Sequence, residues 1–153
     1  MLKNLFKFKN KIILLTGCSG QIGISVAKLY LSLGSKVYGF DLHKPKIKNK
    51  KFIFIKIDIS QSLSIQKKMH EIFIKEKRID ILINNAGTSV FSSIEKRSDS
   101  ELQKVFDTNL KSIINMIKNY SIYYKKFNSK SGNIINMGSI YGLLSPDFNI
   151  YSK

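Results

Sequence analysis

Short apolar runs alternate along the chain with amphipathic segments. Each run is only a few residues long and almost entirely apolar, which is typical of strands buried on both faces of a parallel sheet. In the segments between the runs, apolar residues recur every three or four positions, the period of a helix with one buried face. The pattern predicts strands at 11–16, 36–41, 52–57, 79–83 and 133–137, and helices over 22–33, 65–73 and 102–120.

This alternation indicates a fold class. Strands that alternate with helices pair in parallel through right-handed crossovers, so we predict an α/β fold with a doubly wound, Rossmann-like parallel sheet. No internal repeat, low-complexity tract or linker interrupts the pattern, and 153 residues are enough for one domain but too few for two. Residues 1–153 are therefore expected to form a single domain.

The charge of the chain does not indicate a nucleic-acid partner. The formal net charge is +16, but 24 of the 26 basic residues are lysines, and only Arg78 and Arg97 carry the guanidinium group that base readout favours. The lysines are spread along the whole chain, with one cluster at residues 44–51. We expect this charge to affect solubility and non-specific attraction to anions, and we predict no nucleic-acid partner.

Composition also bears on location and metal binding. No apolar run approaches the roughly 20 residues of a membrane span, and the basic first 11 residues lack the apolar core of a secretory signal. Cys18 is the single cysteine, so no disulfide can form within the chain. We expect no membrane partner and a cytoplasmic location. His43 and His70 have no companions at metal-ligand spacing, so no metal is predicted.

A glycine-rich turn lies where the first predicted strand gives way to the first helix. Glycines allow a tight turn and close approach of the backbone, while N–H groups and the positive helix end can hold a diphosphate. The strand before it, the helix after it and an acidic residue further along make this pattern typical of a dinucleotide site. Cys18, inside the turn, is interpreted as a small side chain in a tight place rather than an activated thiol. The predicted cofactor contacts are Thr16, Gly17, Ser19, Gly20, Gln21, Ile22 and Gly23.

Asp41 ends the second predicted strand, 24 positions after Gly17. A carboxylate at this place accepts hydrogen bonds from the adenosine ribose hydroxyls and repels a 2′-phosphate, so NAD is predicted in preference to NADP. Ser19 adds no cation to the turn, which agrees with NAD. Lys44 and Lys46 lie close in sequence, so NADP stays open as the less favoured cofactor.

These residues resemble the amino-terminal part of the short-chain dehydrogenases/reductases, and the likeness runs in order over nearly the whole chain. The resemblance implies that Asp58 and Ile59 contact the adenine ring, and that Asn85, Ala86 and Gly87 line the ribose side of the cofactor. Beyond the glycine turn and Asp41, it rests on Asp58-Ile59-Ser60, Asn84-Asn85-Ala86-Gly87, Asn109, Ser139 and Tyr151.

The resemblance also implies an NAD(P)-dependent oxidoreductase that transfers hydride between nicotinamide and the carbonyl or alcohol carbon of a small-molecule substrate. Tyr151 would be the acid/base, because a phenol can exchange a proton with the substrate oxygen when nearby cations lower its pKa. Ser139 would hold that oxygen, and Asn109 would position a water of the proton relay. Tyr141 is interpreted as a pocket wall, because Ser145 rather than a lysine stands four residues after it.

The sequence departs from the family at its end. The chain stops at Lys153, before the lysine that the family places four residues after its tyrosine, so we expect a truncated chain with little or no activity. The last family strands would then be missing, which predicts a sheet incomplete at its C-terminal side, with the fifth strand as an unprotected apolar edge. The helix face over residues 110–124 helps form subunit contacts in the family, so a full-length relative is expected to be a homo-oligomer.

Two alternative functions stay open at this point. Gly20 stands three residues after Gly17, the spacing of epimerases and dehydratases that act on nucleotide sugars, although Asn84-Asn85-Ala86-Gly87 is of the compact dehydrogenase type. Residues 138–142 are also reminiscent of reductases of surface-sugar biosynthesis, which hints at a sugar-related substrate. The second alternative is a non-catalytic nucleotide-binding fragment, suggested by the missing lysine.

Overall fold

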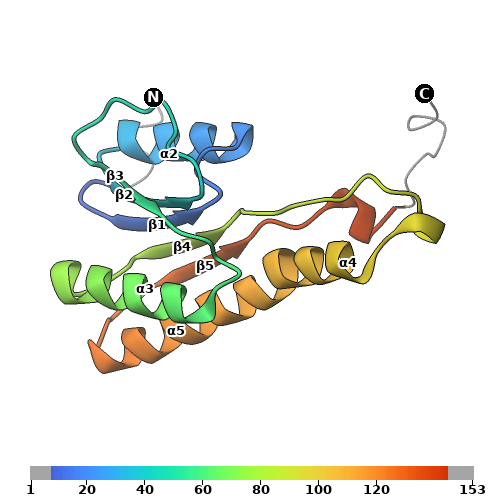
Figure 1. The fold of residues 1–153 in the computed structure, drawn as a ribbon. Coiled ribbons are helices and arrows are strands. Elements are labelled where there is room, and N and C mark those ends of the chain that lie inside the picture. The colour runs from blue at the N-terminus through green and yellow to red at the C-terminus, as the bar shows by residue number, and fades with distance from the viewer. Residues whose placement is uncertain (1–7, 145–153) are drawn as a thin grey trace.

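One parallel sheet organises the molecule. The computed structural model describes residues 8–144, which contain five strands in the order β3-β2-β1-β4-β5 (Figure 1). Every neighbouring pair is parallel. The strands lie where the apolar runs predict them, and the predicted doubly wound α/β fold is confirmed. Their bounds are β1 (Ile12–Thr16), β2 (Lys36–Asp41), β3 (Phe52–Lys56), β4 (Ile81–Asn84) and β5 (Asn133–Asn136).

The strand order reverses next to β1. The chain runs outward from β1 to β2 and β3, then returns across the sheet to form β4 and β5 on the other side. Open α/β sheets bind ligands outside the carboxyl ends of their strands at such a reversal. The topology therefore predicts a ligand site at the carboxyl ends of β1 and β4.

Helices cover both faces of the sheet (Figure 1). α2 (Gln21–Ser32) lies on one face, and α3 (Ser62–Glu76) and α5 (Ser112–Lys126) lie on the other. Alternate residues of β1 serve the two layers, because Leu14 packs in the core beneath α3 and α5 whereas Leu15 packs on the α2 side. β1 is thus buried on both faces, which explains its continuous apolar run.

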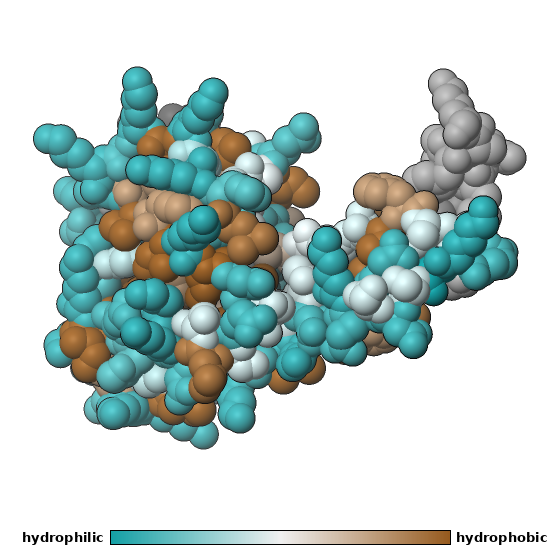
Figure 2. All heavy atoms as spheres, in the orientation of Figure 1, coloured by the Kyte–Doolittle hydropathy of each residue, from teal (hydrophilic) through white to brown (hydrophobic). Residues whose placement is uncertain are grey.

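The long helix predicted over 102–120 is one helical path with a change of winding inside it. α4 (Asp99–Phe106) passes into a π-helical segment (Asp107–Lys111), which passes into α5. α4 begins before the first apolar position of the pattern because Ser98 and Glu101 form a capping box. π-helical turns are frequent at functional sites. α4 and the loop before it extend beyond the sheet, as Figures 1 and 2 show.

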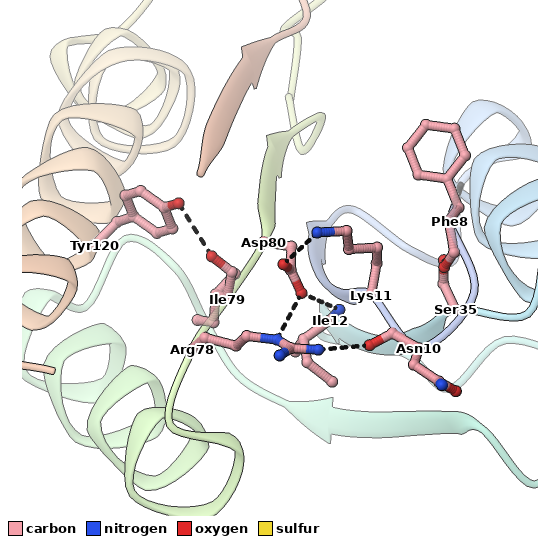
Figure 3. Close-up of polar contacts among 9 residues, drawn as sticks. All are labelled: Phe8, Asn10, Lys11, Ile12, Ser35, Arg78, Ile79, Asp80 and Tyr120. Carbon is pink, nitrogen blue, oxygen red and sulfur yellow. Dashed lines mark hydrogen bonds and ion pairs between the residues drawn. The ribbon is translucent and has the colours of Figure 1, made fainter. Parts of the chain in front are cut away.

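A buried carboxylate joins the amino ends of β1 and β4 (Figure 3). Asp80 is 5% exposed and accepts hydrogen bonds from the Lys11 ammonium at 3.0 Å, the Ile12 backbone N–H at 2.8 Å and the Arg78 Nε–H at 3.1 Å. Arg78 also donates to the carbonyl of Asn10 at 2.9 Å. These contacts fix the start of β4 against the start of β1, at the end of the sheet opposite the strand carboxyl ends.

The surface of the described residues is rich in charged side chains and includes an open sheet edge. Hydrophilic side chains project around most of the face seen in Figure 2. β5 lies at the sheet edge and, within residues 8–144, pairs with β4 alone. Ile134 and Ile135 both remain more than a third exposed, which confirms the predicted apolar edge. Among the described helices, none has the length and apolar character needed to cross a membrane.

Candidate functional site

A cleft of about 570 Å³ opens at the carboxyl ends of β1 to β4. Four parts of the chain form its walls: the glycine turn with the start of α2, the end of β2, the residues after β3, and the residues after β4 together with α4. Most of the predicted cofactor residues therefore meet in one place. Those that line the cleft are Gly17, Gly20, Gln21, Ile22, Gly23, Asp41, Asp58, Ile59, Asn85, Ala86 and Gly87.

The glycine turn needs glycine at two positions for steric reasons. Gly17 has a φ of +67°, and a Cβ on it would lie 2.7 Å from the Cα of Ala86. A Cβ on Gly23 would overlap the carbonyl oxygen of Gly17. The absence of both side chains lets the start of α2 pack directly on the turn and lets the turn pack on the loop after β4.

The amino terminus of α2 faces this cleft with free donors. The first N–H groups of a helix have no intrahelical partner, and no side chain caps α2 at Gly20. A Cβ on Gly20 would make only ordinary contact, 3.6 Å from the Gly17 oxygen, so the protein itself does not demand glycine there. The uncapped N–H groups and the positive end of the helix dipole can bind an anion in the cleft.

Hydrogen bonds of the Thr16 and Asn85 side chains join the glycine turn to the loop after β4. The Thr16 hydroxyl accepts hydrogen bonds from the backbone N–H groups of Asn85 and Ala86, each at 3.0 Å. The Asn85 amide in turn donates to the carbonyls of Thr16 at 3.0 Å and Gly17 at 3.1 Å. Thr16 is buried and does not line the cleft. Its side chain couples β1 to the loop after β4 and so shapes the cleft floor.

Asp41 is held in place by two backbone N–H groups. One carboxylate oxygen accepts from Ser19 at 2.9 Å and the other from His43 at 3.1 Å. The Ser19 hydroxyl donates to the carbonyl of His43. Ser19 itself does not line the cleft, so its side chain ties the glycine turn to the end of β2 instead. Both carboxylate oxygens keep lone pairs for a further donor.

Cys18 fills a tight place, as the sequence predicts. Its side chain is fully buried, and a Cβ on Gly39 in β2 would lie 2.7 Å from its sulfur. Burial, with a smaller effect from the Asp41 carboxylate, raises the pKa of the Cys18 thiol from 9.0 to about 11. The nearby helix terminus does not activate this thiol, because the cost of burying a thiolate is the larger effect.

We expect the Cys18 thiol to resist alkylation by iodoacetamide at pH 8 in the folded protein and to react in urea. Because its pKa in the folded state lies above the ordinary value of 9.0, the unfolded thiol ionises first. The free energy of unfolding should therefore fall as the pH rises from about 9 to about 11. Urea titrations across this range should show a smaller fall for Cys18→Ser, and identical pH profiles for the two proteins would contradict the assignment.

The predicted catalytic residues are only partly placed. Asn109 lies in the π-helical segment, where its side-chain amide donates to the carbonyl of Thr88 and accepts from the Thr88 N–H, each at 2.8 Å. Ser139 begins a 3₁₀ turn (Ile140–Gly142), and its exposed hydroxyl accepts from the Tyr141 N–H at 3.2 Å. Tyr151 lies outside the described residues. Asn109 thus fixes the loop after β4, while the relation of Ser139 to Tyr151 stays a prediction.

Several cleft residues escape the sequence analysis. Lys104 and Thr108, four residues apart on α4 and the π-helical segment, also line the cleft. Phe40, Leu42, Ile57 and Thr88 add further surface. Thr108 directly precedes Asn109, and this adjacency is the feature of the sequence that could have indicated its place at the cleft. Lys104 has no such feature, because its position depends on where α4 lies relative to the sheet.

Fold and cleft together define a nucleotide-binding fold of the Rossmann type. The chain belongs to the short chain dehydrogenase family, whose characteristic sequence pattern matches residues 11–152. A short chain dehydrogenase from Leptospira borgpetersenii, solved with bound NAD⁺, is 34% identical and superposes with a TM-score of 0.91, over 98% of this chain and 59% of that one.

Curated relatives agree with this family. A 3-ketodihydrosphingosine reductase from Bacteroides thetaiotaomicron is 32% identical over 134 residues, which are 88% of this chain and 49% of that protein. A 3-oxoacyl-acyl-carrier-protein reductase from Rickettsia typhi is 33% identical over 143 residues, covering 91% of this chain and 58% of that protein. The chain spans about half the length of the curated relatives it matches.

Proposed function

We propose that the cleft binds NAD as the cofactor of an oxidoreductase acting on the carbonyl or alcohol group of a small molecule. The observation that carries this proposal is the uncapped start of α2, which faces a cleft that a Cβ at Gly17 or Gly23 would disrupt. That arrangement suits a diphosphate, which is anionic and must approach the backbone closely. The bound nicotinamide would supply or accept the hydride.

The preference for NAD over NADP rests on Asp41. Its carboxylate is held at the end of β2 by two N–H groups, with lone pairs left to accept from ribose hydroxyls. A 2′-phosphate at this place would meet a fixed negative charge that has no ion-pair partner among the described residues. The related Leptospira enzyme solved with NAD⁺ is consistent with this preference.

The proposed catalytic roles follow the family. Tyr151 exchanges a proton with the substrate oxygen, Ser139 donates a hydrogen bond to that oxygen, and Asn109 positions a water in the proton relay. The double hydrogen bond between Asn109 and Thr88 supports a fixed position for the asparagine, next to the cleft wall formed by Gly87 and Thr88. The substrate class within carbonyl compounds and alcohols, including a sugar-related one, stays a prediction.

The homo-oligomer expected of the family also has structural support. Phe106, Leu110 and Ile114 follow one another at intervals of four residues, and each side chain is more than half exposed. Residues at this spacing share one side of a helix. An exposed apolar stripe of this kind is typical of a surface that packs against another subunit.

Calorimetric titration of the chain with NADH and with NADPH tests the proposed function. We expect saturable NADH binding, with a dissociation constant about tenfold or more below that for NADPH. Asp41→Asn should narrow the difference between the two cofactors, since it removes the charge that repels the 2′-phosphate. Glu71→Gln, a matched change on the exposed side of α3, should alter neither constant. Absence of saturable NADH binding by the unmodified chain would overturn the proposal.

A further inference from the structure

A second cleft lies at the other end of the sheet from the cleft described above, which is called the cofactor cleft from here on. It has a volume of about 340 Å³ and opens at the amino ends of β1 and β2, where the first residues of these strands, Ile12 and Lys36, are register partners. The start of β1, the start of β2, the residue before β3 and the segment from the end of α3 toward β4 form its walls. None of its lining residues lines the cofactor cleft.

Positive charge exceeds negative charge on the walls of this second cleft. Lys36, Lys51 and Arg78 line it, and the one carboxylate among the lining residues is that of Glu76. Lys36 forms an ion pair with Glu76 at 2.5 Å, and the Tyr38 hydroxyl donates to the same carboxylate oxygen. Lys51 takes part in none of the ion pairs in the described part of the chain. Lys36 therefore neutralises Glu76, and the other two cations have no carboxylate partner inside the cleft.

Arg78 has a carboxylate partner outside the cleft but shares it. Asp80 accepts from the Arg78 Nε–H at 3.1 Å and also from the Lys11 ammonium at 3.0 Å (Figure 3). When this network is counted together with the second cleft, four cations face two carboxylates. The cations are Lys11, Lys36, Lys51 and Arg78, and the carboxylates are those of Glu76 and Asp80. Two positive charges therefore remain uncompensated at this end of the sheet.

Backbone carbonyls hold the cations of the second cleft in place. The Lys51 ammonium donates to the carbonyl of Gly34 at 3.0 Å, and Arg78 Nη2 donates to the carbonyl of Asn10 at 2.9 Å. Figure 3 shows the Arg78 guanidinium directed toward Asn10. An ammonium and a guanidinium each have more N–H groups than these hydrogen bonds of the described residues occupy. The second cleft therefore presents fixed cations that keep donors for a ligand.

A phosphate group matches this arrangement in charge and in hydrogen bonding. A phosphate monoester carries a charge of about −1.5 to −2 near neutral pH and has three strong acceptor oxygens. We propose that the second cleft binds the phosphate group of a small molecule through Lys36, Lys51 and Arg78. The planar guanidinium suits two oxygens of one phosphate, and the lysines act as point charges. The proposal is separate from the proposed function, because the two clefts share no lining residue.

The test replaces Lys51, because its loss leaves no carboxylate unpaired. Lys51 is exposed and forms no ion pair in the described part of the chain, so Lys51→Met and Lys51→Glu should keep the fold. Lys118→Met is the matched control, because Lys118 is an exposed lysine of α5 that lines neither cleft. Thermal unfolding followed by circular dichroism establishes that all three variants are folded.

Calorimetric titrations at low ionic strength measure the dissociation constants for inorganic phosphate, glycerol 3-phosphate and malonate, a dianion without phosphorus. We expect saturable binding of phosphate by the unmodified chain and about tenfold weaker binding by Lys51→Met, since a hydrogen bond to a charged group is lost. Lys51→Glu should show no measurable binding, and Lys118→Met should match the unmodified chain. Tighter binding of glycerol 3-phosphate than of inorganic phosphate would assign the cleft to an organic phosphate, and the reverse order to the free ion.

Nuclear magnetic resonance locates the bound phosphate. We expect the backbone N–H resonances of Gly34 and Lys36 to shift on addition of inorganic phosphate to the unmodified chain. The same shifts should be absent in Lys51→Glu. A phosphate that binds at the glycine turn instead would shift the resonances of Gly20 and Gln21 equally in both proteins, and leave those of Gly34 and Lys36 unchanged.

Three results would overturn this inference. The first is the absence of phosphate binding by the unmodified chain. The second is equal phosphate affinity in the unmodified chain, Lys51→Met and Lys51→Glu, which would place the anion elsewhere. The third is malonate binding as tight as that of phosphate, which would show a site for dianions in general. None of these measurements involves NADH, so a failure of the proposed function and a failure of this inference are distinguishable.

Discussion

Replacing Gly23 with alanine is expected to abolish measurable NADH binding, a loss of at least about a hundredfold, and to destabilise the fold. The new Cβ would overlap the Gly17 carbonyl oxygen and lie 2.9 Å from the Cα of Cys18. Both are backbone atoms that no side-chain rotation can move. α2 must therefore shift away from the glycine turn, which displaces the N–H groups that face the cleft. Overpacking of this kind costs about 1–3 kcal/mol of the free energy of unfolding.

Gly138→Ala is the matched control, because a Cβ on Gly138 meets no atom within 4 Å. Calorimetric titration with NADH and urea unfolding should show this variant to be equal to the unmodified chain. A Gly23→Ala protein that binds NADH with unchanged affinity would contradict the close packing of α2 on the turn.

Asp80→Asn is expected to lower the free energy of unfolding by about 1–3 kcal/mol. The change removes a buried negative charge that accepts three hydrogen bonds, two of them from cations. The loss stays below that for a fully buried ion pair, because the side chains of Lys11 and Arg78 are 36% and 51% exposed and can be rehydrated. Urea unfolding monitored by circular dichroism measures the difference.

Asp107→Asn tests whether burial of the carboxylate is the reason for the loss of stability expected in Asp80→Asn. Asp107 forms an ion pair with Lys111 on the helix surface, and exposed pairs contribute little to stability. This variant should unfold at nearly the same urea concentration as the unmodified chain. Equal losses from the two substitutions would show that the buried network at the amino ends of β1 and β4 has no special role.

The sheet could be predicted from the sequence because its central strands are buried on both faces. β1 and β4 have no exposed face, so their apolar runs are continuous and their positions unambiguous. The winding change inside the long helix could not be predicted. Apolar residues recur at helical spacing on both sides of the π-helical segment, and this spacing does not reveal which backbone hydrogen bonds form. The capping box of Ser98 and Glu101 was visible in the sequence and could have located the start of α4.

In the candidate site, too, local features could be predicted from the sequence and tertiary contacts could not. Contacts within a single strand–turn–helix unit, such as Gly17 with Gly23, follow from local spacing, and so does the place of Asp41 at the end of β2. Sequence reasoning did not separate residues that line the cleft from residues that support it, such as Thr16. Lys104 was missed because its place at the cleft depends on how α4 packs relative to the sheet, which is a tertiary relation.

The two edges of the sheet differ in how they would receive an added strand. β3, at one edge, is preceded by Lys51 and ends at Lys56, and charged lysines discourage backbone pairing with another chain. β5, at the other edge, consists of Asn133–Asn136 and contains no charged residue. We therefore expect further strands, whether from a longer polypeptide or from another molecule, to add to the sheet beside β5 and not beside β3.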